Sequence, residues 1–158
     1  MKLRGKEKFF WERNFNIKSA RDIPEVIDGI KGIDSDHDDE FFFFLTSRVQ
    51  HVGKIHLRCT NLTDTGVKYI STIKNLKELT LKDHNQLTKA CLEDINKLAD
   101  LEYLDISSND FSIEDILQLT NLKKLKHLII SVSVQDDNMG GSLIRLKNQF
   151  AGCDITIY

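Results

Sequence analysis

The sequence is poor in proline, tryptophan and cysteine, and it lacks any long apolar run. No window reaches the roughly 18 apolar residues that a membrane-spanning helix needs. Glu12 and Arg13 interrupt the basic start, so the apolar core of a secretory signal peptide is missing as well. Cys59, Cys91 and Cys153 are widely spaced and form no CxxC pair, which favours reduced thiols over a disulfide framework. These absences predict a cytoplasmic protein with no membrane partner.

A strong charge of one sign is also missing. The formal net charge is −2 at pH 7, whereas domains that bind nucleic acid are usually strongly basic, so we expect no nucleic-acid partner. With 41% hydrophobic and 29% charged residues, the composition is that of an ordered globular chain. Its 158 residues fit one domain, which we expect to be a monomer.

The sequence does contain an internal repeat. Thr63, Thr88 and Ser112 lie 25 and 24 residues apart, and the residues at offsets +4, +7, +10, +13, +16 and +18 from each are all aliphatic. Such self-similarity indicates repeated structural units. The aliphatic positions are Val67, Ile70, Ile73, Leu76, Leu79 and Leu81; Leu92, Ile95, Leu98, Leu101, Leu104 and Ile106; and Ile116, Leu119, Leu122, Leu125, Leu128 and Ile130.

Each unit has the pattern of a helix followed by a strand. The Thr or Ser at the origin is a good helix N-cap, and offsets +4, +7 and +10 follow one helical face. Offsets +16 and +18 change the period to that of a strand with one buried side. Successive units therefore predict a parallel sheet with helices on its outer side.

These units resemble leucine-rich repeats. Residues 61–81, NLTDTGVKYISTIKNLKELTL, resemble the cysteine-containing subclass of F-box proteins and of small proteins such as ATP synthase coupling factor B. The resemblance implies an α/β fold, a right-handed solenoid with a short parallel sheet on the concave side and helices on the convex side. Thr60, His84 and Asn109 fill the strand-end position where the family has Cys or Asn, which predicts an irregular side-chain ladder. The matching segments are Leu76-xx-Leu79-x-Leu81, Leu101-xx-Leu104-x-Ile106-xx-Asn109 and Leu125-xx-Leu128-x-Ile130.

The repeats extend in both directions. We predict an N-terminal capping segment over residues 1–33 and a repeat domain over 34–158, with about four repeats and a degenerate final repeat that ends in an edge strand. In the cap, Pro24 is expected to open a short helix and residues 30–33 to form an extra strand. The added positions are Phe43, Thr46, Val49, Val52, Ile55 and Leu57 from an origin at Asp39, and Leu143, Leu146, Ile155 and Ile157 from an origin near Met139 after a looser turn at 134–141.

The stretch IDSDHDDEFFFFL, residues 33–45, begins with a cluster of acidic residues. Asp38 and Asp39 stand at the start of the first predicted helix, where carboxylates favour the positive end of the helix dipole. The alternating Asp34, Asp36 and Asp38 also open like a calcium loop, but Asp39 stands where such a loop needs glycine. Helix capping is the favoured interpretation and no cofactor is predicted. A weak divalent-metal site on these three aspartates is the alternative, because the resemblance to coupling factor B implies magnesium binding.

The same stretch ends in four phenylalanines. Phe43 occupies the core offset, whereas Phe41, Phe42 and Phe44 are in excess over the later repeats. The first unit of a repeat array lacks a neighbour on one side, so its open end has to be covered. We expect the N-terminal segment to cover it, and the alternative is an exposed aromatic patch that docks a partner. The segment supplies Phe9, Phe10, Trp11, Phe15, Ile17, Ile23, Val26, Ile27 and Ile30.

The candidate binding residues alternate with the buried strand positions and so line the predicted concave face. The N-terminal half of this face is mostly basic, whereas Tyr103, Ile129 and Tyr158 supply the anchors typical of interface hot spots. We expect a protein partner with an acidic portion, and the alternative is a solvated face with no ligand. The candidates are Lys54, His56, Arg58, Glu78, Thr80, Lys82, Tyr103, Asp105, Ser107, His127, Ile129, Ser131, Asp154, Thr156 and Tyr158.

Catalytic and zinc chemistry are not predicted. His56 and His127 lie three strands apart, roughly 14 Å at about 4.8 Å per strand, so one ion cannot bridge them. Asp105, Ser107 and His127 fall on neighbouring strands like a triad, but an open sheet offers no oxyanion hole or water-excluding pocket. The sequence also has no phosphate-binding glycine loop, nucleophile elbow or HExxH helix.

The sequence therefore predicts a non-enzymatic module for protein–protein interaction, with a partner of unknown identity. The warrant is partly associational, because the resemblance implies binding in general. Two more specific roles stay open. One is an immunity or antitoxin protein that covers a toxin, and the other is a metal-dependent assembly or accessory factor.

Overall fold

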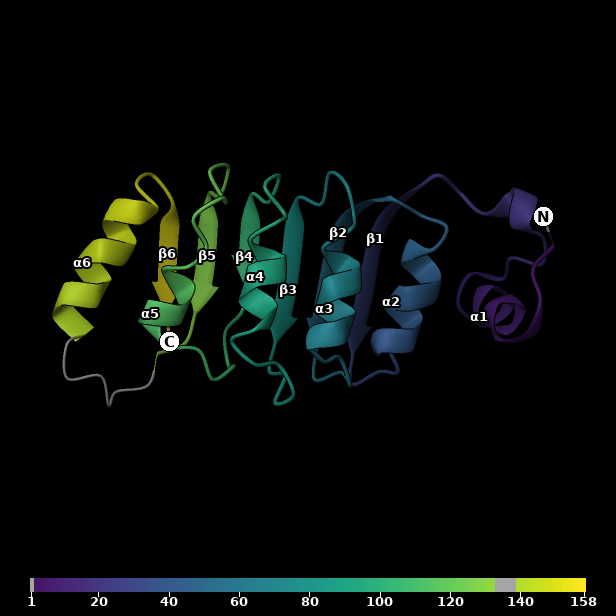
Figure 1. The fold of residues 1–158 in the computed structure, drawn as a ribbon, viewed down its shortest axis with the longest axis horizontal. Helices are drawn as coiled ribbons and strands as arrows, with labels where there is room; N and C mark the ends of the chain where they lie inside the picture. Colours follow the sequence, from purple (N-terminus) through teal and green to yellow (C-terminus); the bar gives the residue numbers. More distant parts are fainter. Residues whose placement is uncertain (1, 133–138) are drawn as a thin grey trace.

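The computed structural model describes residues 2–132 and 139–158 and contains one six-stranded sheet (Figure 1). The strands lie in chain order, and each pairs in parallel with the next. The α/β class and every predicted strand are confirmed, including the extra strand before the first repeat and the edge strand at the C-terminus. The strands are β1 (Val26–Ile33), β2 (His51–Arg58), β3 (Glu78–Lys82), β4 (Tyr103–Asp105), β5 (His127–Ile130) and β6 (Asp154–Ile157).

The helix α1 precedes the first strand, and one helix, from α2 to α6, connects each strand to the next. Figure 1 shows α2 to α5 on one side of the sheet, with α1 and α6 at the two ends of the row. Most of the turn expected at 134–141 lies outside the described residues. The helices are α1 (Gly5–Phe15), the 3₁₀ turn η1 (Ala20–Asp22), α2 (Asp39–Thr46), α3 (Asp64–Ile70), α4 (Cys91–Ile95), α5 (Ile113–Ile116) and α6 (Met139–Gln149).

The core consists of the repeated aliphatic positions. All eighteen predicted residues are buried, none with more than 7% of its surface exposed. Two of the three predicted N-caps are confirmed, since the hydroxyls of Thr63 and Ser112 accept backbone N–H groups at the starts of α3 and α5. The third is wrong, because Ala90 is the N-cap of α4 and makes no side-chain cap hydrogen bond, although the Thr88 hydroxyl accepts the Ala90 N–H at 3.2 Å. The helices are shorter than the offsets predict. Ile73 and Leu98 lie beyond α3 and α4, in turns closed by i to i+3 hydrogen bonds, which are common where a helix ends.

In the first repeat, the predicted core positions Val49, Val52, Ile55 and Leu57 are buried, but the predicted register of the helix α2 is wrong by one residue. Asp38, not Asp39, caps α2, and its carboxylate accepts the N–H of Phe41 at 2.9 Å. Phe42 and Leu45 then face the core with 0% exposure, whereas Phe43 is 48% exposed. Since Leu45 replaces Thr46 at the inward position, the one apparent exception in the predicted pattern disappears.

The prediction for Pro24 is also wrong. Pro24 opens no helix, because Val26–Ile33 forms a strand along the whole edge of β2. The helix of this segment is α1, which begins at Gly5 in a part of the sequence that has no repeat pattern. A proline just before an edge strand costs no ladder hydrogen bond, which explains why it is tolerated there.

Carboxylates connect the starts of α2 and α3 to the following repeats. Asp39 accepts both the N–H and the hydroxyl of Thr63, and Asp64 accepts the same two groups of Thr88. Gly66 lies beside the first of these contacts, and a Cβ atom there would come within 2.4 Å of an Asp39 carboxylate oxygen. The close approach of α2 and α3 therefore requires glycine at this position.

The strand ends carry the irregular side-chain ladder that was predicted. The Thr60 hydroxyl and His84 Nε2 lie 2.9 Å apart, and the side-chain Oδ1 of Asn109 accepts the backbone N–H of His84 at 2.8 Å. Asn109 also donates to the carbonyl oxygens of Leu81 and Ile106. His84 is 1% exposed, and its Nδ1 has no hydrogen-bond partner. Three different side chains thus perform one structural task in successive repeats.

Candidate functional site

The side of the sheet away from α2 to α5, here called the open sheet face, holds the predicted binding residues. Strand pairing aligns them in rows across the sheet, because the register is continuous from β2 to β6. One row contains Lys54, Glu78, Tyr103, His127 and Asp154, and the next contains His56, Thr80, Asp105, Ile129 and Thr156. Arg58 and Lys82 pair in a third row.

The half of this face on β2 and β3 is basic. Lys54 donates to Glu78 at 2.6 Å, and His56 Nε2 lies 3.2 Å from the other Glu78 oxygen. The lysine hydrogen bond is the main reason why the pKa of Glu78 is below its ordinary value. Arg58 is exposed and Lys82 half-buried. One carboxylate is therefore set among several cations, and the surplus positive charge faces solvent.

The other half of the face carries the aromatic anchors. The Tyr103 ring lies between the rings of His56 and His127, with centroid distances of 6.4 and 6.2 Å. Burial is the main cause that raises the pKa of its hydroxyl. Tyr158, which follows β6, is 73% exposed, and its ring centroid is 5.6 Å from the Nζ of Lys82 in β3. Aromatic rings and cations are thus interleaved over a broad surface, as at many protein interfaces.

Two predicted binding residues do not belong to the exposed surface. Asp105 is 8% exposed and Ser107 is 0% exposed. The Asp105 carboxylate accepts both the N–H and the hydroxyl of Ser107, at 2.9 and 2.7 Å. Their polar groups are therefore satisfied inside the turn after β4. The hydroxyl proton points to Asp105 and not to His127, so the geometry is not that of a nucleophile beside its base.

The structure adds two residues to the face that the sequence prediction left out. β1 pairs with β2 so that Lys31 stands beside His56 and Ile33 beside Arg58. Ile33 is 52% exposed. The predicted strand over residues 30–33 shows the same alternation with the buried Ile30, but the predicted binding face begins at Lys54 and does not include this strand.

Two aspartates of the acidic stretch at residues 34–40 interact with other groups of the chain. Asp36 pairs with Arg13 of α1 at 2.9 Å, and Asp38 caps α2. Asp34 has a left-handed backbone, with φ of 47°, at the end of β1. In the part of the chain that the structure describes, no three His, Cys, Asp or Glu side chains come together as a metal-binding group. Helix capping by Asp38 is confirmed.

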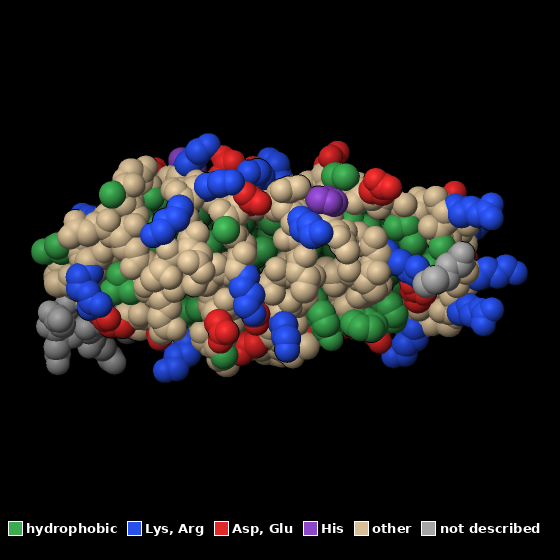
Figure 2. All heavy atoms as spheres, turned by 45° about the horizontal axis from the view of Figure 1, so that its top comes forward, with side chains coloured by type: hydrophobic (Ala, Val, Ile, Leu, Met, Phe, Trp, Pro, Cys, Tyr) green, Lys and Arg blue, Asp and Glu red, His purple; other side chains and the backbone are tan. Residues whose placement is uncertain are grey.

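Some aromatic residues of α1 and α2 pack against one another, and others are exposed. The Phe10 ring lies 5.1 Å from that of Phe41 and 5.5 Å from that of Phe44, so α1 does cover the first repeat. Phe9 is 64% exposed, and Figure 2 shows a group of hydrophobic side chains over α2, where Phe43 is 48% exposed. A groove of about 430 Å³ between α1 and α2 runs between these surfaces. The intramolecular cap is thus present, and it leaves some aromatic surface uncovered.

The cysteine thiols are free, with Cys91 buried and Cys59 and Cys153 half-buried. Burial is the main cause that raises the pKa of Cys91 to about 12, so its unreactive thiol form persists at neutral pH.

Among the described residues, no helix is long and apolar enough to cross a membrane. Comparison with known protein families finds no model that matches this chain, and comparison with curated proteins finds no match either.

Proposed function

We propose that this chain is a leucine-rich repeat solenoid that recognises a protein partner through its open sheet face and performs no catalysis. The sequence repeat and the burial of all its eighteen aliphatic positions support the solenoid. So does the parallel sheet in which every strand neighbours the next along the chain.

The observation that carries the binding proposal is the composition of the open sheet face. Its aligned rows present Lys31, Lys54 and Arg58 on β1 and β2 and Tyr103 on β4, and the Tyr158 ring lies over Lys82 of β3. A rigid sheet holds these side chains at fixed spacing, which lowers the entropy lost when a partner binds. A partner with carboxylates facing β1 to β3 and apolar side chains facing β4 to β6 complements this arrangement.

A capture experiment in native cell lysate tests the proposal. The wild-type chain is immobilised beside an Arg58→Glu/Tyr103→Ala variant, and retained proteins are identified by mass spectrometry. A Lys68→Glu/Tyr69→Ala variant makes similar changes on α3, on the opposite side of the sheet, and serves as the control. We expect a stoichiometric partner that the control retains and the open-face variant loses.

Other outcomes contradict the proposal. If both variants retain the partner as the wild type does, the open sheet face is not the binding site. If only the α3 variant loses the partner, the aromatic surface that includes Phe43 and Tyr69 is the binding site, because these two rings lie 5.5 Å apart.

A further inference from the structure

The sheet has two outer edges, at β1 and at β6, and the edge at β6 is the less protected one. A sheet edge presents backbone groups that can pair with another strand, and proteins usually protect such edges with charged side chains, proline or local irregularities. β1 has two of these features, because Asp28 and Lys31 are exposed and the ladder with β2 skips Asp28. In contrast, β6 pairs with β5 at every residue from Asp154 to Ile157, and residues 155–157 are uncharged and β-branched.

Ile155 and Ile157 direct their backbone groups away from the sheet. In a parallel ladder, the N–H and C=O groups of alternate residues point to the same neighbouring strand. The N–H groups of Asp154 and Tyr158 donate to backbone carbonyl oxygens of the adjacent segment 126–130. The N–H and C=O groups of Ile155 and Ile157 therefore point to the outer side of β6. Within residues 2–132 and 139–158, no hydrogen bond reaches these outward groups.

The side chains of β6 determine what an added strand would meet on each face. Ile157 is 39% exposed, whereas Ile130, its partner in β5, is 1% exposed. The helix side of this edge is therefore apolar and incompletely covered. On the open sheet face, the Asp154 side chain is 77% exposed, and its carboxylate lies 3.8 Å from His127 Nδ1. An added strand thus meets isoleucine on one face and a carboxylate on the other.

The outward backbone groups favour an extended polypeptide as the occupant of this edge. They alternate between donors and acceptors, and another polypeptide strand satisfies both, whereas the phosphates of a nucleic acid can only accept hydrogen bonds. A second copy of this chain fits less well. Figure 1 shows α6 beyond β6 at the end of the row of helices, so two copies joined edge to edge would bring their α6 helices together over the junction. A single extended segment carries no helix layer and avoids this overlap.

We propose that the outer edge of β6 docks one extended segment of a protein partner, which continues the six-stranded sheet by one strand. Alternate residues of the segment place a Lys or Arg beside Asp154 on the open sheet face and a β-branched side chain beside Ile157 on the helix side. Its backbone pairs with the outward groups of Ile155 and Ile157, at the usual strand spacing of about 4.8 Å. The inference does not rest on the proposed role of the open sheet face, because its main contacts are backbone groups of the edge.

A fluorescein-labelled peptide of four Lys-Val repeats tests the proposal by fluorescence anisotropy. Its alternation places lysines on one face and valines on the other in either strand direction. A peptide with the same residues in one lysine block and one valine block is the sequence control, and it should bind at least tenfold more weakly. Two further peptides carry N-methyl groups on all lysines or on all valines. We expect only one of them to lose binding, because only one set of N–H groups faces β6.

Protein variants separate the backbone contribution from that of the side chains. Ile157→Pro removes one outward N–H group, which the ladder with β5 does not use, and Ile157→Ala shortens the same side chain but keeps this group. We expect Ile157→Pro to weaken binding of the alternating peptide at least tenfold and Ile157→Ala less than threefold. Asp154→Lys should also weaken it at least tenfold. Asp110→Lys, an equal change in charge at an exposed position after β4, should change it less than twofold.

Several results would overturn the proposal. These are no measurable binding of the alternating peptide by the wild type, equal binding of the block peptide, the same effect of both N-methylations, and equal losses in Ile157→Pro and Ile157→Ala. Sedimentation of the wild-type chain alone tests the other occupant. A dimer that Ile157→Pro dissociates would show that a second copy occupies the edge.

Two measurements locate the bound peptide. Hydrogen exchange of the Ile155 and Ile157 amides should slow when the alternating peptide binds, and unchanged exchange would contradict docking at β6. The Arg58→Glu/Tyr103→Ala variant should bind the peptide as the wild type does. If this variant abolishes binding while Ile157→Pro does not, the peptide occupies the open sheet face and the edge proposal is wrong.

Discussion

The N-terminal region and the middle of the molecule fill their cores in different ways. Between β3 and β5, aliphatic side chains such as Leu79, Leu104 and Leu128 stand in register and are completely buried. At the N-terminal end, large rings from two helices pack together, with Phe10 of α1 against Phe41 of α2. The reason is positional. A middle repeat has a similar neighbour on each side, whereas the first repeat is covered by a segment that has no repeat pattern.

The difference also affects how stability is distributed. Each middle strand is paired on both sides. In contrast, α1 is joined to the rest by ring contacts, by the exposed ion pairs Lys6–Glu40 and Arg13–Asp36, and by the more shielded pair Arg48–Glu7, whose side chains are 20 and 22% exposed. Exposed ion pairs contribute little. The N-terminal helix should therefore open locally at a lower free energy than the sheet.

A pair of core truncations gives the largest expected effect. Leu104→Ala should lower the free energy of unfolding by about 3 to 5 kcal/mol, because a fully buried leucine loses its contacts on both neighbouring strands. Phe10→Ala should act mainly on α1, so hydrogen exchange should become faster in α1 while β4 keeps its protection. Urea unfolding and native-state hydrogen exchange measure the two effects. Equal loss of protection in β4 for both variants would contradict the proposed difference between the regions.

Two histidines whose pKa is lowered by burial, His84 and His37, allow a comparison by pH. Burial is the main cause that lowers the pKa of His84 in the middle and of His37 near the N-terminus. The folded protein thus keeps His84 neutral at a pH where the unfolded chain, with an ordinary pKa of about 6.5, takes up a proton. Stability should be full above that pH and should fall as the pH drops toward the lower pKa of the folded state.

The His84→Gln variant tests this dependence. It should lose about 1 kcal/mol at pH 8, because the contact with Thr60 is altered, and it should show a weaker fall in stability from pH 7 to pH 5. Melting temperatures across this pH range measure both effects. His37→Gln should change the slope less, since His37 is only half-buried and faces Asp36 and Asp38. An unchanged slope in His84→Gln would show that another group causes the acid sensitivity.

The acidic stretch before α2 gives the smallest effect. Asp38→Ala should cost about 1 kcal/mol through loss of the N-cap. Asp36→Ala, at an exposed ion pair, should change stability by less than about 0.5 kcal/mol. Thermal melting with and without magnesium or calcium measures these changes. A metal-dependent rise in melting temperature that disappears in the double variant would contradict the capping interpretation and favour a metal site.

The sequence predicted the repeated part of the fold better than its ends. The period of the aliphatic residues identified the buried positions from Val67 to Ile130, because the same offsets recur in three successive repeats. In the first repeat, four consecutive phenylalanines are compatible with a helix that begins after Asp38 or after Asp39. The structure shows that Asp38 is the N-cap. The N-terminal helix α1 was missed because its burial depends on two rings, Phe10 and Trp11, and not on a periodic face.

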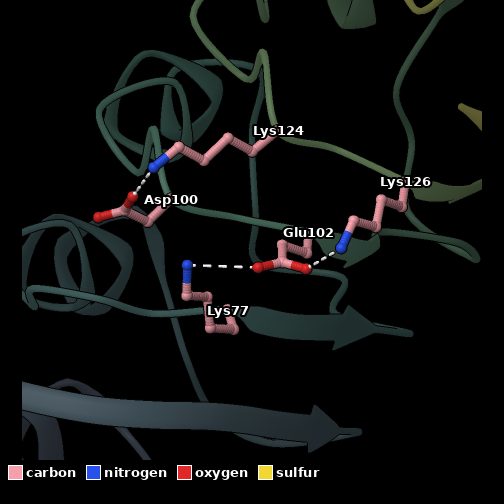
Figure 3. Close-up of polar contacts among 5 residues, drawn as sticks. All are labelled: Lys77, Asp100, Glu102, Lys124 and Lys126. Atoms are coloured by element: carbon pink, nitrogen blue, oxygen red, sulfur yellow. Dashed lines mark hydrogen bonds and ion pairs between the residues drawn. The ribbon is translucent and has the colours of Figure 1, made fainter. Parts of the chain in front are cut away.

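For the candidate site, the sequence predicted which residues of neighbouring strands lie side by side on the open sheet face, but not how each side chain is buried or paired. Strand alternation placed Lys54, Glu78 and Tyr103 side by side, as the register shows. It did not predict the burial of Asp105 and Ser107, which results from a local turn in which one carboxylate takes two hydrogen bonds. The ion pairs Lys124–Asp100 and Lys126–Glu102 (Figure 3) were not predicted either, since each joins residues from neighbouring repeats whose contact depends on the turn geometry.

The position of Tyr158 has a practical consequence for any fusion protein. Its ring reaches toward Lys82 on the open sheet face, so a linker or affinity tag attached after this residue would begin on that face. Such an attachment could block a partner in the same way as a substitution. The start of α1 lies at the far end of the row of helices (Figure 1), so a bait for partner capture should be tethered there.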